Sequence, residues 1–171
     1  MEPVPHSSIP PVREDPIDAP TRRRLPLLLR RSWYGLNQAF RRRIAHLGLT
    51  PDQFTVMRSL LEGDPEGMTQ RQLTEAMSSD PNTVASLLER MEKAGLLRKK
   101  PHERDRRAHR ILPLQKGKTT YQAARKIAVA LQSEVLTILP EDSRESFLEA
   151  LTLIGEACRQ AADSSPRRTK S

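Results

Sequence analysis

The sequence predicts a mainly α-helical chain that contains one small β-hairpin. Apolar residues recur at spacings of three and four through most of residues 26–161, which is the period of a helix with one buried face. Helix-start signals, in which a Thr or Asp precedes an apolar turn, occur at Thr50, Thr69 and Asp80. Residues 96–112 depart from this period, because two short strand-like runs there flank a polar, basic segment.

The two ends of the chain lack any periodicity. The first 20 residues hold six prolines, four acidic residues and one basic residue, so residues 1–21 are expected to form a disordered, acidic arm. Such an arm could shield a basic surface, and a loose tail is the simpler alternative. Residues 163–171 are polar and basic and are expected to form a flexible tail.

A long helix is expected from residue 26 to residue 46, within an N-terminal segment of residues 22–48. Its apolar stripe comprises Trp33, Leu36, Phe40, Ile44 and Leu47, and its polar faces carry Arg30, Arg31, Arg41, Arg42 and Arg43. The next helix begins at a capping box formed by Thr50 and Gln53 and ends before Gly63. Its apolar stripe comprises Phe54, Met57, Leu60 and Leu61.

Two short helices joined by a tight turn follow. Thr69 and Gln72 form a second capping box, which starts a helix that ends near Met77. After a polar turn, Asp80 and Pro81 supply an N-cap and a first-turn proline. This helix reaches about residue 94 and stops at Gly95. At the start of the first helix, the residues predicted to contact DNA together with the helix that follows are Thr69, Gln70 and Arg71.

The second of these helices has two chemically different faces. Its apolar stripe of Val84, Leu87, Leu88 and Met91 is expected to be buried. The other face carries small or hydrogen-bonding side chains, which suit an approach to base edges in the major groove of DNA. The predicted contact residues on this helix are Pro81, Asn82, Thr83, Ser86 and Arg90.

A basic hairpin follows, with strands expected at residues 96–100 and 108–112. From residue 98 to residue 110 there are seven Arg or Lys residues against two acids. A charge run is often just a solvated surface, but this one directly follows a two-helix pattern, where a winged helix places its wing against DNA. The predicted wing contacts are Arg98, Lys99, Lys100, Arg104, Asp105, Arg106 and Arg107.

Two further helices complete the chain. The first is expected over residues 118–139, with Tyr121, Ala124, Ala128, Leu131, Val135 and Ile138 facing inward. Pro140 interrupts it, and Glu141 and Asp142 place acids at the positive start of the last helix. The stripe of that helix comprises Phe147, Leu148, Leu151, Ile154 and Cys158.

Three segments of this chain resemble the MarR family of bacterial winged-helix transcription regulators. They are residues 49–54 (LTPDQF), 88–96 (LERMEKAGL) and 105–108 (DRRA), and the similarity extends over about residues 25–160. It implies a winged helix-turn-helix DNA-binding domain at residues 49–114, and dimerisation helices at residues 22–48 and 115–162. It also implies a homodimer that binds a pseudo-palindromic operator in double-stranded DNA, as a repressor that a small aromatic effector releases.

The sequence departs from the family pattern at two places. Pro113-Leu114-Gln115-Lys116-Gly117 stands where the family has Leu-Thr-x-x-Gly, which removes a Thr N-cap. Pro81 and Ser86 stand where many relatives carry arginines, and this leaves the base preference open. An effector pocket of the family kind would be lined by Trp33, Phe40, Phe54, Met57, Tyr121 and Arg125, although helical spacing makes a plain core the alternative.

Bulk properties agree with a nucleic-acid partner. The net charge is +8, so a homodimer would carry twice that charge, and the charge is clustered. Three of the expected helices have apolar stripes with no partner in a single reading domain, which favours a dimer. The competing function is a protein-interaction module with an acidic partner.

Other kinds of chemistry have little support in the sequence. The single cysteine fits a reducing cytoplasm, and its place on an apolar stripe favours a core role over a redox switch. No enzyme motif, metal site or cofactor is expected. The longest N-terminal apolar run is interrupted by Pro26, so no membrane association is expected and the protein is assigned to the bacterial cytoplasm, at the nucleoid when bound to DNA.

Overall fold

The computed structural model describes residues 19, 24–101 and 108–164, and the chain divides into two compact units, residues 1–39 and 40–171. The boundary lies within helix α1 (Leu25–Ile44). In the first unit, residues 25–39 of α1 expose most of their large apolar side chains, among them Trp33 and Tyr34, which are 64% and 60% exposed.

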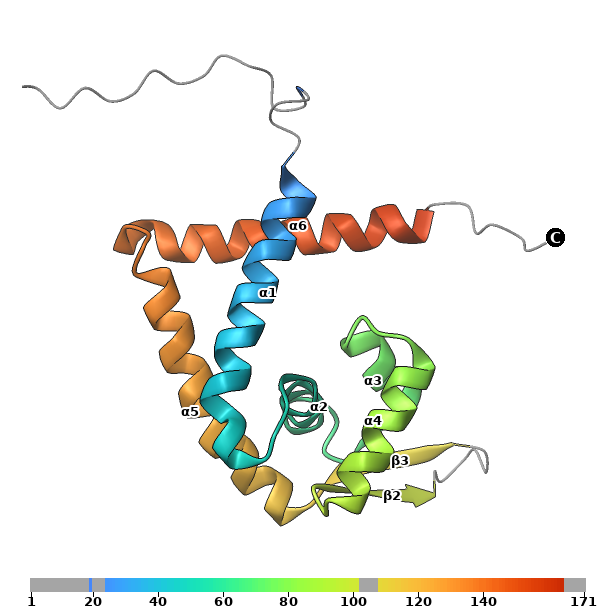
Figure 1. Cartoon of the computed structure of the whole chain (residues 1–171). Coiled ribbons are helices and arrows are strands. Elements are labelled where there is room, and N and C mark those ends of the chain that lie inside the picture. The colour runs from blue at the N-terminus through green and yellow to red at the C-terminus, as the bar shows by residue number, and fades with distance from the viewer. Residues whose placement is uncertain (1–18, 20–23, 102–107, 165–171) are drawn as a thin grey trace, which may run out of the picture. The chain divides into compact units, whose positions relative to one another are not determined.

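The second unit is predominantly helical with one small sheet, which confirms the predicted fold class (Figure 1). After the end of α1 it comprises η1 (Ala45–Leu47), α2 (Pro51–Glu62), β1 (Met68–Thr69), α3 (Gln70–Ala76), α4 (Pro81–Lys93), β2 (Leu97–Pro101), β3 (His109–Pro113), α5 (Gln115–Leu136), η2 (Glu141–Ser143) and α6 (Arg144–Ser164). Within the described residues, none of the helices combines the length and apolar character needed to cross a membrane.

The sheet is antiparallel, with strand order β1-β3-β2. Ile111 in the central strand pairs with Met68 of β1 and with Lys99 of β2. The hairpin strands lie one residue later than predicted, because Leu96 belongs to the helix end. Its N–H donates a hydrogen bond to the carbonyl of Met91 at 3.0 Å. This bond closes a helix C-cap in which Gly95 adopts the left-handed conformation (φ 71°). The two-residue strand β1 was not predicted.

The core surrounds α2, which contacts α3, α4, α5 and β3. Phe54 of α2 packs edge-on against Phe40 at 4.9 Å and stacks on Tyr121 of α5 at 5.0 Å, measured between ring centroids. Each large apolar side chain that is fully buried contributes about 1.5–3 kcal/mol relative to an exposed one. The fully buried set is Ile44, Val56, Met57, Leu73, Val84, Leu88, Met91, Leu97 and Ile111.

The predicted apolar stripes were wrong at several positions. Val56 is fully buried and Leu61 is 36% exposed, because α2 is covered from more than one side and its buried surface is wider than a single stripe. On α5, Tyr121, Ala124 and Leu131 are buried, whereas Val135 near its end is 50% exposed. Ile138, which was predicted to lie on this helix, falls two residues after its end and is 87% exposed. Only the first two-thirds of this region packs against the core of the chain.

The start of α5 also differs from the prediction, since the helix begins at Gln115 rather than at residue 118. Leu114 is the N-cap and makes no side-chain cap hydrogen bond, but its N–H donates to the carbonyl of Leu96 at 3.0 Å. This tertiary contact anchors the N-cap residue to the segment that follows α4, but it supplies no acceptor for the first-turn amides that a Thr hydroxyl would bind. Further along the chain, Arg43 forms a two-pronged ion pair with Glu134, with both N–O distances at 2.8 Å, which ties the end of α1 to α5.

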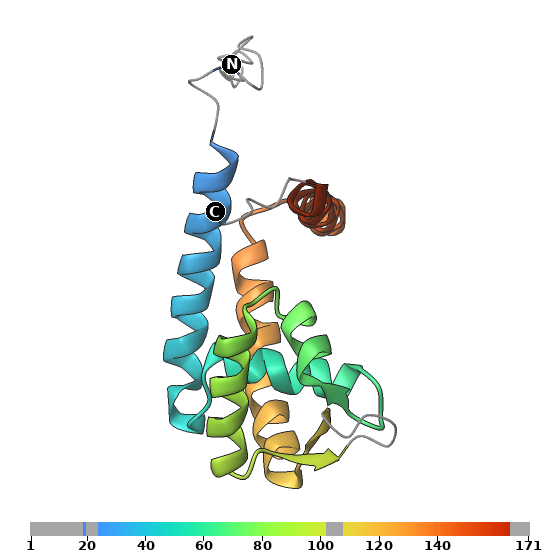
Figure 2. The same ribbon diagram turned by 90° about the vertical axis from the view of Figure 1, so that its right-hand side faces the viewer.

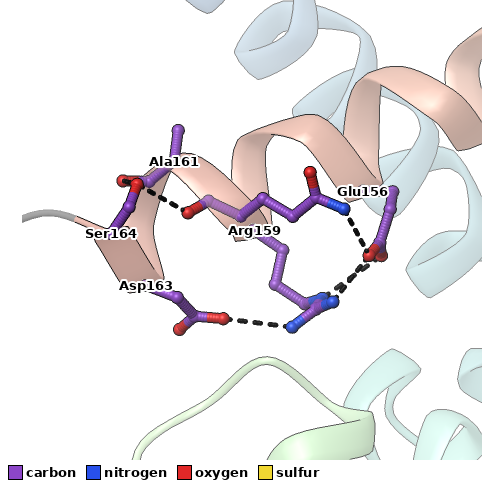
Figure 3. A network of polar contacts seen from close by, with 6 residues as sticks. Glu156, Arg159, Ala161, Asp163 and Ser164 are labelled. Carbon is purple, nitrogen blue, oxygen red and sulfur yellow. Dashed lines mark hydrogen bonds and ion pairs between the residues drawn. The ribbon is translucent and has the colours of Figure 1, made fainter.

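Helix α6 has no buried residue in the single chain, although all its residues are described. Phe147 and Leu151 on its apolar stripe are 44% and 38% exposed. The opposite face is ordered by local ion pairs, in which Arg159 binds Glu156 at 2.6 Å and Asp163 at 3.0 Å (Figure 3). The hydrogen bond from Arg159 lowers the pKa of Glu156. The helix continues to Ser164, beyond the predicted end at residue 162.

Candidate nucleic-acid interface

The first helix of the reading pair, α3, begins as predicted. The N–H of Gln72 donates to Thr69 Oγ1 at 3.3 Å, and the N–H of Thr69 donates to Gln72 Oε1 at 2.8 Å, which completes a reciprocal capping box. Two backbone amides at the start of α3 are therefore satisfied within the chain. Arg71 projects from this turn with its side chain 89% exposed and pairs with Glu75 one turn later at 3.0 Å.

The turn that leads into α4 is held by backbone hydrogen bonds and one side chain. The N–H groups of Ser78 and Ser79 donate to the carbonyls of Glu75 and Thr74, with Ser78 in the left-handed region at φ 49°. Gln70 Nε2 donates to the carbonyl of Pro81 at 3.1 Å. Gln70, predicted as a DNA contact, thus also braces the start of α4.

Helix α4 starts at the predicted N-cap. Asp80 Oδ1 accepts hydrogen bonds from the N–H groups of Asn82 at 3.1 Å and Thr83 at 2.9 Å. Hydrogen bonds from Thr83, first from its side chain and then from its backbone, lower the pKa of Asp80, and the bond from Asn82 adds to this. The first turn of the helix is therefore held by an ionised cap.

The two faces of α4 have the burial that the sequence predicted. Val84, Leu87, Leu88 and Met91 are buried, with exposures of 0–4%. The predicted contact residues, which are Pro81, Asn82, Thr83, Ser86 and Arg90, are all exposed. Arg90 Nε donates to the carbonyl of Ser86 at 3.2 Å, so its side chain folds back along the helix. The exposed face offers amide and hydroxyl groups, donors and acceptors of the kind that read base edges.

The hairpin places its basic residues on different surfaces. Leu97 and Ile111 are buried, while Arg98 and Lys100 alternate with the inward-facing residues of β2 and are exposed. Lys99 is half-buried and pairs with Glu92. Arg110 Nη1 donates to the carbonyl of Gly67 at 3.0 Å, which supports the loop before β1. The predicted wing residues Arg104, Asp105, Arg106 and Arg107 lie outside the described residues.

A hollow of about 450 Å³ lies between the start of α3 and the hairpin. It brings together two predicted contact sets that are far apart in the sequence, with Arg71 on one side and Lys99 on the other. His109 adds an imidazole to these two cationic side chains. The lining residues are Thr69, Gln70, Arg71, Lys99, Ala108, His109 and Ile111.

The predicted effector pocket is filled by its own side chains in the second unit. Phe40, Phe54 and Tyr121 pack ring against ring, and Met57 is fully buried. Arg125 on α5 is exposed. Trp33 belongs to the first unit. Four of the six predicted residues therefore form core in the structure, and ligand binding by the set stays a prediction. Among the residues that the structure describes, no group of three or more His, Cys, Asp or Glu side chains could hold a metal ion.

Three residues near the interface were missed from the sequence. Glu92 contacts Lys99, Lys116 Nζ donates to the carbonyl of Ala94 at 2.8 Å, and Gly117 lies against the backbone of Leu96. These contacts join the C-terminal end of α4 to β2 and to the start of α5. The ribbons of these three elements lie side by side in Figure 2. Residues 92–96 (EKAGL) lie within a segment that resembles the MarR family, but their local pattern does not indicate which later residues they contact.

Comparison with known proteins gave consistent matches. The sequence pattern of the MarR family matches residues 47–108. The transcriptional regulator HosA of Escherichia coli is 30% identical over 127 residues, which span 71% of this chain and 93% of HosA. The M. tuberculosis transcriptional regulator MosR, solved in complex with DNA, is 27% identical with a TM-score of 0.63, over 78% of this chain and 96% of MosR.

A second DNA complex has a similar fold. The transcriptional repressor CouR of Rhodococcus jostii, solved bound to a 23-mer DNA duplex, is 25% identical with a TM-score of 0.71. The match covers 83% of this chain and 99% of CouR.

Proposed function

Because this chain belongs to the MarR family of transcriptional regulators, we propose that it binds double-stranded DNA sequence-specifically, as a homodimer on a pseudo-palindromic operator, and represses transcription. The observation that carries the proposal is the exposed face of α4. Asn82, Thr83 and Ser86 lie there on a helix whose start is fixed by Asp80 and by Gln70. Held in this way, the face can enter a major groove as one rigid surface.

Each side chain of this face has a definite capacity for DNA contacts. Asn82 can pair with N6 and N7 of adenine, and the Thr83 methyl can pack on a thymine methyl. Arg90 is assigned to the phosphate backbone, because its guanidinium folds back along the helix. The exposed Arg98 and Lys100 are assigned to backbone contacts, and Arg106 and Arg107 to the minor groove by their place in the wing sequence.

The homodimer is supported by the apolar surface of α1 and α6. Leu25, Leu28 and Leu36 on α1 are about half exposed, and no residue of α6 is buried. Apolar stripes exposed along two helices of a chain with net charge +8 normally meet partner surfaces. A two-fold dimer would present two copies of α4 to major grooves about 34 Å apart.

The test is selection of bound duplexes from a random pool, followed by titration of the selected and a scrambled duplex at several salt concentrations. Asn82→Ala and Ser86→Ala should each cost on the order of 1–3 kcal/mol on the selected duplex and relax one position of each half-site. The salt slope should stay nearly constant, because these side chains displace no counterions. Ser133→Ala, at an exposed position of α5, is the matched control. If both variants still discriminated fully between the selected and the scrambled duplex, α4 would not be the helix that reads the DNA sequence.

Variants of the wing should behave in the opposite way to variants of α4 in these titrations. Replacing Arg106 and Arg107 together by Ala should weaken binding to both duplexes and make the dependence of log K on log salt shallower. Unchanged affinity at moderate salt would exclude a wing contact. An acidic protein partner in place of DNA would be indicated if the selection enriched no sequence.

The proposal also includes repression that is released when a small aromatic effector binds. A small aromatic ligand would have to open the cluster of Phe40, Phe54 and Tyr121, since these rings occupy the space themselves. Salicylate and related phenolic acids, titrated into the complex with the selected duplex, provide the test. Tyr121→Ala should change the response if the ligand binds there.

A further inference from the structure

The junction between α4 and the wing contains one carboxylate that contacts both elements. Glu92 lies in the last turn of α4, and its Oε1 accepts a hydrogen bond from the backbone N–H of Lys99 at 3.2 Å. Its other oxygen, Oε2, lies 3.5 Å from Lys99 Nζ. Glu92 therefore holds the third residue of β2 through both its backbone and its side chain.

The position of β2 in the sheet explains why such a contact is needed. The strand order is β1-β3-β2, so β2 is an edge strand, and no other strand of the described residues pairs with its outer side. The N–H of Lys99 is satisfied by Glu92 across this edge rather than by the ladder. The Glu92 carboxylate, on the recognition helix, thus provides the acceptor that a neighbouring strand would otherwise supply.

Nearby hydrogen bonds hold the end of α4, on which Glu92 lies, in place. Lys116 Nζ binds the carbonyl of Ala94, and the N–H of Leu114 binds the carbonyl of Leu96. The end of α4 is thereby attached to the start of α5, and only residues 94–96 separate α4 from β2. The buried Leu97 packs the start of β2 into the core. Glu92 adds a polar contact from α4 two residues further along the strand, where β2 leads into the wing.

We propose that Glu92 is a positioning residue that fixes the wing strand β2 against the recognition helix α4, so that base contacts and phosphate contacts are made in one register. The proposal rests on the proposed DNA-binding function. It also assigns Lys99 a new role. Lys99 acts as a brace, because its ammonium is engaged by Glu92 and its side chain is only 30% exposed.

The competing explanation is that Glu92 is only a surface charge. The two explanations predict opposite changes in DNA affinity when Glu92 is removed. Removing an acid beside a polyanion strengthens binding if charge alone matters, since it also releases the ammonium of Lys99 for phosphate contact. Removing a positioning contact weakens binding despite the gain in charge. Glu89, exposed on α4 three residues earlier, gives a matched control for the charge.

The experiment compares Glu92→Ala, Glu92→Gln, Glu89→Ala and Glu89→Gln on the selected and scrambled duplexes, in the full-length protein. Glu92→Ala should lower affinity for the selected duplex on the order of tenfold and make the salt slope shallower, because the wing no longer reaches its phosphates in register. Glu92→Gln should restore most of the affinity, since its amide oxygen still accepts from the Lys99 N–H. Both Glu89 variants should bind as well as the wild type or better.

A second measurement needs no DNA. Hydrogen exchange at the Lys99 amide in the free protein should be slow in the wild type and in Glu92→Gln, and fast in Glu92→Ala. Equal exchange in all variants, or tighter DNA binding by Glu92→Ala, would overturn the positioning role. If the wild type showed no preference for the selected duplex while the exchange pattern held, the brace would stand and the proposed DNA-binding function would fail.

Discussion

Helices α4 and α6 have the same kind of sequence and different surroundings. Both carry an apolar stripe along one face and polar residues on the other. In α4 four apolar residues are buried, whereas α6 has no buried residue along its whole length. The periodicity of a sequence therefore identifies which face of a helix will be covered. It does not identify whether the cover comes from the same chain.

The polar contacts of the two helices differ in the same way. Those of α4 reach other elements, as with Gln70 at its start and Glu92 at its end. Among the residues that the structure describes, the ion pairs of α6 join residues three and four apart, such as Glu156 with Arg159 (Figure 3). Helix α4 is thus packed into the core of the second unit, while α6 has local ion pairs on one face and an exposed apolar stripe on the other. Four experiments test this contrast, in order of decreasing expected effect.

The largest effect is expected from a charge on the open stripe of α6. Leu151→Glu places a carboxylate among Phe147, Ile154 and Cys158 on one helical face, so it should weaken dimerisation at least about 100-fold, or about 3 kcal/mol. Leu153→Glu is the matched control, because Leu153 is 71% exposed and points away from that stripe. Sedimentation at sub-micromolar concentration measures both. A stable wild-type monomer, or equal effects of the two variants, would refute the interface.

The next effect compares two glycines in helices. In Gly117→Ala the new Cβ would meet the carbonyl oxygen of Leu96 and approach Met57 Cε to 2.9 Å, so the free energy of unfolding should fall by about 1–3 kcal/mol. A Cβ added at Gly155 on α6 would have no neighbouring atom within 4 Å. Gly155→Ala should therefore raise the free energy of unfolding by up to about 1 kcal/mol.

Urea denaturation at one fixed protein concentration measures both glycine variants, because dimerisation would contribute to stability. A loss of stability in Gly155→Ala would show that a partner chain approaches α6 closely at this residue. No loss in Gly117→Ala would mean that α5 can shift away from Leu96, and the close packing at the junction would be wrong.

A smaller effect is expected from the cap of α4. The pKa of Asp80 is lowered from its ordinary value of 3.8, chiefly by hydrogen bonds from Thr83, so its ionised form is favoured by folding. This contribution is complete above pH 3.8 and is lost as the pH falls through the lowered value. Asp80→Asn keeps a capping side chain but does not titrate.

The measurement for Asp80 is the urea midpoint as a function of pH. The wild type should lose more stability than Asp80→Asn between about pH 5 and about pH 2.5. Asp142→Asn, which removes an acid just before α6, controls for net charge. Parallel curves for the wild type and Asp80→Asn would mean that the cap does not couple to folding.

The smallest effect concerns the turn before α4. Ser78 adopts φ 49°, the left-handed region, at the same position after α3 that Gly95 occupies after α4. Ser78→Gly should stabilise the protein by about 0.5–1 kcal/mol, and Gly95→Ala should destabilise it by about 1 kcal/mol. Thermal unfolding followed by circular dichroism measures both. Destabilisation by Ser78→Gly would show that the hydroxyl group contributes more than the backbone strain costs.

The sequence by itself determined the features that depend on neighbouring residues. The helix starts at Thr50, Thr69 and Asp80 were predicted because a cap and the amide it binds lie two or three residues apart. The buried stripe of α4 and the exposure of Asn82 and Ser86 followed from the helical period in the same way. Most of the candidate reading surface was therefore evident before the structure.

Only the tertiary structure decided the features that depend on which elements meet. The pair of Arg43 and Glu134 joins residues 91 apart, and the fit of Gly117 against Leu96 joins the start of α5 to the end of α4. The strand β1, the contact from Glu92 to Lys99 and the wide buried surface of α2 have the same origin. A local pattern carries no information about a distant partner, because packing and backbone hydrogen bonds form wherever the fold brings groups together. For the same reason the apolar stripe of α6 could be predicted from the sequence, whereas the single chain leaves that stripe without a buried residue.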